Sequence, residues 1–62
     1  MNADQERWAE ALAVERRHGD LAHRHVAERV RELALAGDEQ GVKRWREIAA
    51  RLDQLALSEV IQ

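Results

Sequence analysis

Two Gly-Asp pairs, Gly19-Asp20 and Gly37-Asp38, divide a proline-free chain of 62 residues into three segments. In such a pair the glycine can take the left-handed backbone conformation that ends one helix, and the aspartate can cap the next helix. Apolar residues in the segments recur at steps of three and four, without the period-two alternation of a strand. The sequence therefore predicts an all-α fold, with three short helices joined by tight Gly-Asp turns in a small helical bundle.

The first helix is expected to begin after Asn2, whose side chain can accept a hydrogen bond from the backbone N–H near Gln5. Its last turn carries Arg16, Arg17 and His18, cations that the helix dipole favours at this end. Its apolar side chains lie on two sides, with Trp8, Ala11, Leu12 and Val14 on one and Ala9 and Ala13 on the other. The alanine strip is smooth enough for another helix to approach closely.

The second helix is expected over residues 21–36 and the third over residues 39–56. The third is the clearest amphipathic segment, with apolar residues at helical spacing in Val42, Trp45, Ile48, Ala49, Leu52, Leu55 and Ala56. On its other face Glu47 precedes Arg51 by four residues, which is the favourable order for an ion pair. Gly41 is expected to let a neighbouring helix or turn pack closely.

The domain organisation follows from these helices. Residues 3–56 are expected to form one three-helix domain. Residues 57–62 are apolar for the end of a chain, and they either extend the third helix or contact another surface.

The apolar content allows one small core. The large apolar side chains are seven Leu, five Val, two Ile and two Trp. A domain of this size buries only about 60% of the surface that its unfolded chain exposes, and ordering each residue costs about 1.5 kcal/mol. Because the chain has no cysteine to staple it, self-association or partner binding is the remaining source of burial. We expect a homodimer or a protein partner, with the contact residues Leu35, Leu57, Val60 and Ile61.

Charge and the N-terminal sequence narrow the possible classes of protein. The formal net charge of −2 does not favour a dedicated nucleic-acid binder, which usually carries a basic face. Residues 1–17 match neither a secretory signal nor a membrane span, so we expect a cytoplasmic protein without membrane contact. The run Lys43-Arg44-Trp45-Arg46 combines cations with an aromatic ring. A small nucleic-acid-associated regulator that docks Lys43, Arg44 and Arg46 is therefore the alternative function.

Three histidines, His18, His23 and His25, are the candidates for metal binding. His23 and His25 are two residues apart and would point about 200° away from each other on a helix. No HxxxH pattern places two imidazoles on one face, so a metal-responsive switch at His18 and His23 is only a minor alternative. The sequence also does not bring a nucleophile, a base and an oxyanion donor together. We expect no catalytic residues, no cofactor and no metal, and the chain is not predicted to be an enzyme.

Short segments along most of the chain are shared with a known family: Glu6-Arg7-Trp8, His18-Gly19-Asp20, Val26-Ala27-Glu28-Arg29-Val30, Leu33-Ala34-Leu35-Ala36-Gly37-Asp38, Gly41-Val42, Arg44-Trp45-Arg46-Glu47-Ile48-Ala49 and Arg51-Leu52-Asp53. On these segments the chain resembles a family of short bacterial helical proteins that is known as a domain of unknown function. The resemblance implies a whole small protein and implies no activity. The function expected from the residues is a stand-alone protein-interaction module, which acts as an adaptor, a regulator or an inhibitor-like binder and self-associates.

Overall fold

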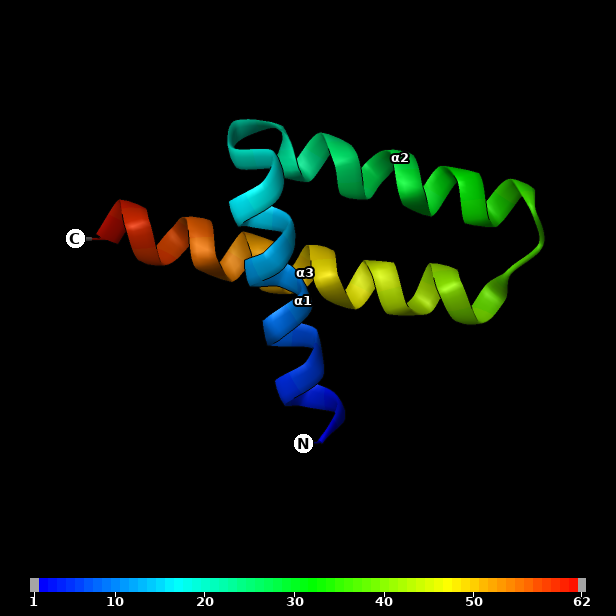
Figure 1. The fold of residues 1–62 in the computed structure, drawn as a ribbon, viewed down its shortest axis with the longest axis horizontal. Coiled ribbons are helices and arrows are strands. Elements are labelled where there is room, and N and C mark those ends of the chain that lie inside the picture. Colours follow the sequence, from blue (N-terminus) through cyan, green and yellow to red (C-terminus); the bar gives the residue numbers. More distant parts are fainter. Residues whose placement is uncertain (1, 62) are drawn as a thin grey trace.

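Helix dominates the part of the chain that the structure describes. The computed structural model describes the backbone of residues 2–61 and the side chains of residues 2–57. The helices are α1 (Ala3–His18), α2 (Ala22–Leu35) and α3 (Glu39–Ile61), with a 3-10 turn, η1 (Gly19–Leu21), between α1 and α2 (Figure 1). No strand occurs among these residues, so the predicted all-α class is confirmed. None of the described helices has the length and apolar character needed to cross a membrane.

The expected count of three separate helices is wrong, because the first Gly-Asp turn is itself helical. α1, η1 and α2 follow one another without a residue between them, so the described chain has two helical stretches, residues 3–35 and 39–61, and the first of them changes direction at Gly19. Gly19 has φ 54° and ψ −125°, and the turn that it begins continues into α2. Leu21 rather than Asp20 precedes α2, and no side chain caps this helix. The predicted cap at Asp20 is therefore wrong as well.

The second Gly-Asp pair forms the turn that the sequence predicts. Gly37 takes φ 76°, and the N–H groups of Gly37 and Asp38 donate to the carbonyls of Ala34 and Leu33 at 3.1 and 2.9 Å. This is the Schellman pattern of a helix C-terminus. Asp38 Oδ1 then accepts from the N–H of Gly41 at 2.9 Å and caps α3. A Cβ at Gly41 would lie 2.6 Å from Asp38 Oδ2, so the close packing predicted at this glycine is confirmed.

Both ends of α1 also follow the prediction. The Asn2 side chain accepts from the N–H of Gln5 at 2.8 Å, and the Gln5 side chain accepts from the N–H of Asn2 at 3.1 Å. This capping box satisfies two backbone donors that the helix itself leaves free. Arg16, Arg17 and His18 lie in the last turn, as expected.

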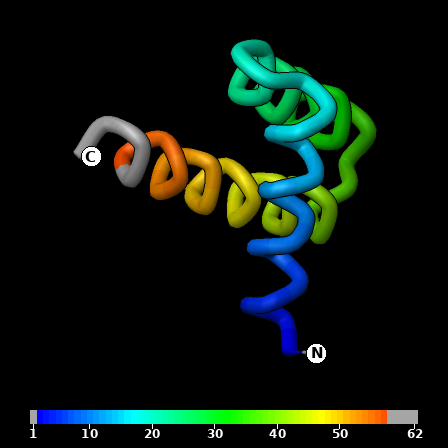
Figure 2. The backbone as a smooth tube through the Cα atoms, turned by 60° about the vertical axis from the view of Figure 1, so that its left-hand side comes forward, coloured from blue at the N-terminus to red at the C-terminus, as the bar shows by residue number. Residues whose placement is uncertain are grey.

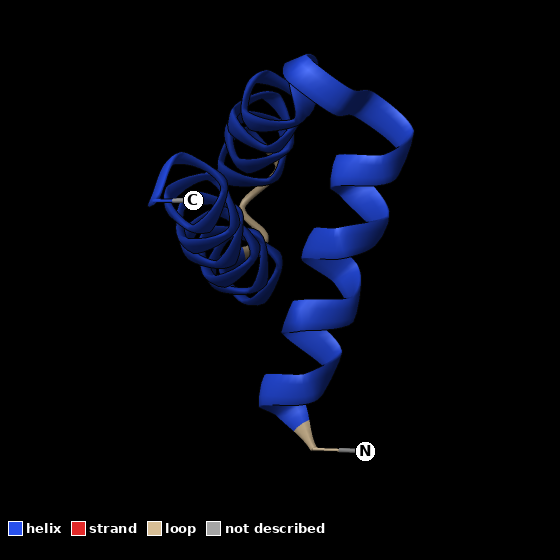
Figure 3. Ribbon diagram, turned by 90° about the vertical axis from the view of Figure 1, so that its left-hand side faces the viewer, coloured by secondary structure: helices blue, strands red, loops and turns tan. Residues whose placement is uncertain are grey.

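α2 and α3 form an antiparallel helical hairpin, and α1 crosses one face of it. Figure 1 shows α1 passing over α3 and ending beside the start of α2. The tube in Figure 2 and the view along the hairpin in Figure 3 both place α1 on one side of the two other helices. The molecule is flat, with extents of 40 × 27 × 17 Å. The small helical bundle expected from the sequence is not confirmed, because α1 crosses the hairpin instead of running alongside it.

The core lies where α1 meets the hairpin. The buried side chains among residues 2–57 are Ala11 of α1, Ala22 and Val26 of α2, and Ile48 and Leu52 of α3. Val14, Val30, Trp45, Ala49 and Leu55 are partly buried and pack around them. Large apolar side chains also stay exposed, namely Leu12, Leu21, Leu35 and Leu57. A core this small makes each buried side chain important for stability.

Candidate functional site

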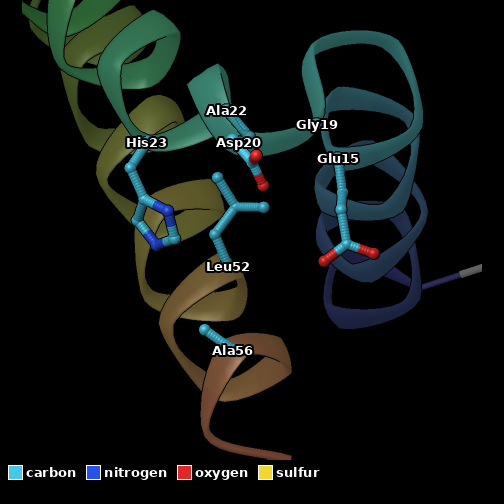
Figure 4. Close-up of a pocket in the computed structure, with 7 residues that line it drawn as sticks. All are labelled: Glu15, Gly19, Asp20, Ala22, His23, Leu52 and Ala56. Atoms are coloured by element: carbon cyan, nitrogen blue, oxygen red, sulfur yellow. The ribbon is translucent and has the colours of Figure 1, made fainter. Parts of the chain in front are cut away.

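The crossing of α1 over the hairpin leaves a hollow on each side of α1. One hollow, the Trp45 groove, has a volume of about 470 Å³ and is lined by Ala13, Val14, Arg17, His18, His25, Arg29 and Trp45. The other, the Glu15 hollow, has a volume of about 380 Å³ and is lined by Glu15, Gly19, Asp20, Ala22, His23, Leu52 and Ala56 (Figure 4). Because Glu15 and Arg17 are two residues apart, they point about 200° apart around the helix axis. The two hollows therefore lie on different sides of α1.

Aromatic rings from all three helices meet in the Trp45 groove. The ring of His18 on α1 stacks on the ring of His25 on α2, with centroids 3.9 Å apart and planes inclined by 15°. The His25 ring in turn meets Trp45 of α3 edge to face, at 5.8 Å. The guanidinium carbon of Arg29 lies 5.5 Å from the centroid of the Trp45 ring, within the range of a cation–π contact. These contacts join residues that lie far apart in the sequence.

The Trp45 groove has a cationic lining. Arg17 and Arg29 are permanently charged, and no carboxylate lines the groove. Burial, together with the nearby charges of His25 and Arg17, lowers the pKa of His18 from its ordinary value. An additional proton on His18 is therefore unfavourable unless a negative charge enters the groove.

The Glu15 hollow has the opposite character. Figure 4 shows Leu52 in its middle, with His23 on one side and Glu15 on the other. Asp20 adds a second carboxylate, and His23 Nε2 lies 3.1 Å from Asp53 Oδ1. An acidic hollow and a basic groove thus flank the same helix.

The histidines do not come together as a metal site. His18 lines the Trp45 groove and His23 lines the Glu15 hollow, so the structure does not bring the proposed switch residues to one ion. Among the described residues no group of three or more His, Cys, Asp or Glu side chains is placed to hold a metal ion. The histidines that the structure does bring together are His18 and His25, whose rings stack, and not His18 and His23.

Ion pairs hold α1 against α3. Arg7 of α1 donates to Glu10 at 2.8 Å and to Glu47 of α3 at 2.9 Å. Glu10 also accepts from Arg44 of α3, whose Nε lies at 2.8 Å. The hydrogen bond to Glu47 raises the pKa of Arg7. Burial acts to raise the pKa of Glu10, but its hydrogen bonds with Arg44 and Arg7 and their charges hold that pKa below its ordinary value.

A second contact between the same helices involves Arg51 of α3. Its Nη2 donates to Asp4 at 2.6 Å, and its guanidinium carbon lies 5.4 Å from the centroid of the Trp8 ring. The ion pair expected between Glu47 and Arg51 is therefore wrong, because each side chain turns to a residue of α1. No local sequence signal marks these partners, which are about forty residues away.

The basic run of α3 is divided by these contacts. Lys43, Arg44 and Arg46 are all exposed, but Arg44 is paired with Glu10 of α1. Trp45 turns into the groove and is half-buried. The four residues do not present one continuous basic face.

The residues predicted to contact a partner are also separated. Leu35 is 79% exposed and Leu57 is 59% exposed. Leu35 ends α2 beside the hairpin turn, and Leu57 lies twenty residues beyond Gly37 along α3, or about 30 Å at 1.5 Å per residue. They therefore occupy opposite ends of the hairpin and form no common patch. Val60 and Ile61 lie outside the residues whose side chains are described.

The fold and its two hollows define an all-helical protein in which a helical hairpin is crossed by a preceding helix. The chain belongs to the family of unknown function DUF6961, whose family model matches residues 3–60. The resemblance to a domain of unknown function seen in the sequence is thereby confirmed. No curated protein and no solved structure matches the chain.

Proposed function

We propose that the protein is an interaction module that self-associates, and that two copies meet through the outer face of α1. This face points away from the hairpin, opposite the fully buried Ala11. Its exposed residues are Glu6, Ala9, Ala13 and Arg16. At about 100° per residue, all four lie within about 40° of the direction opposite Ala11. They therefore form one continuous stripe.

The charge pattern of this stripe is the observation that carries the proposal. The residues are spaced by three, four and three positions, so the pattern has the same spacing from either end. If two copies of α1 lie antiparallel with their centres aligned, Ala9 faces Ala13 of the second copy. Glu6 then faces Arg16 of the second copy, and this contact occurs twice because the arrangement has twofold symmetry. A parallel arrangement would instead place like charges together.

The side chains of the stripe are suited to such a contact. The alanines allow two helices to approach closely, since the distance between packed helices depends on the side chains between them. Neither Glu6 nor Arg16 forms an ion pair with another side chain of residues 2–57. Both charges are thus available to a second copy without breaking a contact within the first.

The amount of exposed surface also supports association. The accessible surface is 4811 Å², whereas a monomeric protein of this mass exposes about 4,100 Å². The difference, about 700 Å², is close to the roughly 800 Å² that each partner buries in a typical stable interface.

Charge exchange tests the proposal. Glu6→Arg and Arg16→Glu each turn two attractive contacts per dimer into two repulsive ones. At about 0.5 kcal/mol for an exposed pair, each single variant should weaken dimerisation by about 2 kcal/mol, or roughly 30-fold in Kd. The double variant should regain most of the loss. Arg31→Glu, an exposed charge on α2, is the matched control and should have little effect.

The measurement is the solution mass by light scattering over a concentration series at low salt. A native chain that stays monomeric at every concentration would remove self-association altogether. A dimer that the double variant does not rescue would place the contact elsewhere. Truncation after Ala56 would then test the apolar segment that includes Leu57.

Such a module would act as an adaptor, a regulator or an inhibitor-like binder, with a second copy of itself as its first partner. The alternative of a nucleic-acid-associated regulator has less support, because Arg44 is engaged by Glu10. The cytoplasmic location expected from the sequence stays a prediction.

A further inference from the structure

We infer that the Trp45 groove is a binding site for a phosphate-bearing ligand, whose phosphate is held between Arg17 of α1 and Arg29 of α2. This inference is independent of self-association through the outer face of α1. It rests on the convergence of cationic and basic side chains from separate helices in one concave surface.

The sign of the charge in the groove is unusual for this chain. The sequence contains 12 Asp and Glu but only 10 Lys and Arg, so a surface hollow would be expected to include a carboxylate. The titratable residues that line the Trp45 groove are instead Arg17, His18, His25 and Arg29. The acidic lining lies across α1, in the Glu15 hollow. The fold therefore separates positive from negative charge around one helix.

Phosphate fits this lining better than a carboxylate does. Two guanidinium groups supply planar forks of N–H donors that match the oxygens of phosphate. The imidazoles of His18 and His25 can supply further N–H donors. The groove volume of about 470 Å³ is much larger than a lone phosphate group, so the ligand can extend along the apolar side chains of Val14 and Trp45.

On the side of His18 and His25 that faces the groove, all the permanently charged side chains in the lining are positive, which favours binding of an anion. Arg17 on α1 and Arg29 on α2 face the stacked rings, and α3 contributes the uncharged Trp45. Arg24 and Glu28 lie with His18 and His25 in a neighbouring hollow, which these two rings also line.

The existing ion pair of Arg29 does not close the site. Arg29 donates to Glu32 at 2.9 Å, and the Glu32 side chain is exposed while that of Arg29 is partly buried. An exposed pair at this spacing within a helix contributes only a few tenths of a kcal/mol. A phosphate group can therefore replace Glu32 as the partner of Arg29 at little cost.

Binding should be coupled to protonation. Burial and the charges of His25 and Arg17 lower the pKa of His18 in the empty groove. An anion beside the ring counteracts these charges and raises that pKa, so ligand binding takes up a proton and tightens as the pH falls. Sulfate, whose charge is constant across the histidine range, should shift the His18 titration upward.

The test is a titration of the full chain with pyrophosphate, adenosine monophosphate and adenosine, followed through the histidine ring signals in NMR. Pyrophosphate and the nucleotide should move the signals of His18 and His25. The signal of His23, in the Glu15 hollow, is the internal control and should stay in place. Tighter binding of the nucleotide identifies an organic phosphate as the ligand, and tighter binding of pyrophosphate identifies an inorganic one.

Two pairs of arginine variants separate a specific site from general attraction. Arg17→Gln with Arg29→Gln should lower the affinity by about 25-fold, at about fivefold for each ion pair. Arg31→Gln with Arg46→Gln removes the same charge from exposed positions outside the groove and should cost less than about threefold. Arg17→Gln alone is the variant least expected to disturb the fold, because Arg17 forms no ion pair with another side chain of residues 2–57. A loss of affinity in this single variant therefore cannot be attributed to misfolding.

Three results would overturn the site. The first is the absence of any shift of the His18 and His25 signals at millimolar pyrophosphate or nucleotide. The second is an equal shift of the His23 signal. The third is an equal loss of affinity in both arginine pairs, which would show that the anion responds to net charge alone.

Discussion

Replacing Glu10 by Gln tests whether ion pairs hold α1 across the hairpin. Glu10 accepts from Arg7 Nη1 at 2.8 Å and from Arg44 Nε at 2.8 Å, and its side chain is only 24% exposed. Glutamine keeps the shape but removes the charge from both contacts. Partly exposed ion pairs contribute about 0.5–1 kcal/mol each, so the variant should lose about 1–2 kcal/mol. In a domain of about 60 residues this lowers Tm by roughly 5–15 °C.

The matched control is Glu28→Gln. Glu28 pairs with Arg24 within α2 at 3.6 Å, and both side chains are more than half exposed. Its removal should cost less than about 0.5 kcal/mol. Thermal unfolding followed by circular dichroism, at one protein concentration, compares the two variants with the native chain. Equal losses in the two variants would refute the role assigned to Glu10.

The pH dependence gives an independent check on the same residue. The folded-state pKa of Glu10 lies below its ordinary value, so its charge stabilises the fold above the unfolded pKa of about 4.3. This contribution is lost as the pH falls through the folded pKa, where Glu10 becomes protonated. The Tm difference between Glu10→Gln and the native chain should therefore shrink over the acid range, as the pH falls from above this unfolded pKa through the lower folded pKa. A difference that stays constant over this range would contradict the reasoning.

Two further substitutions test the core and the hairpin turn by denaturant unfolding. Leu52→Ala should lower the free energy of unfolding by about 2–5 kcal/mol, because the side chain is only 2% exposed. Leu57→Ala, at an exposed position of the same helix, should lower it by less than about 0.5 kcal/mol. Similar losses in the two variants would show that the core lies elsewhere. Gly37→Ala should cost about 1–2 kcal/mol, because the left-handed φ of 76° is unfavourable for a side chain. Unchanged stability of this variant would mean that the turn readily adopts another conformation.

Helix ends that depend on neighbouring residues could be predicted from the sequence. The Asn2–Gln5 capping box and the turn at Gly37 and Asp38 form through hydrogen bonds that span only a few residues. The same reasoning was right that Gly19 ends α1 with a positive φ, but it was wrong at Asp20, where a 3-10 turn leads into α2 without a side-chain cap. Since both pairs have the same two residues, local chemistry alone does not decide which turn forms.

Ion pairs between helices could not be predicted in the same way. The spacing of Glu47 and Arg51 favours a pair within α3, but Glu47 instead accepts from Arg7, forty residues earlier in the chain. A helical spacing rule can identify only partners on one helix. Arg7 becomes a competitor only after the fold has brought α1 against α3.

The sequence by itself determined the all-α class, the capped ends of α1, the second turn and the apolar side of α3, because all of these depend on local spacing. The tertiary structure decided the angle at which α1 crosses the hairpin, which depends on contacts between distant residues. That crossing brings Arg17 and His18 to His25, Arg29 and Trp45, and it leaves the outer face of α1 uncovered. Periodicity specifies which side of a helix faces the core, but it does not specify which other helix meets that side or in which direction.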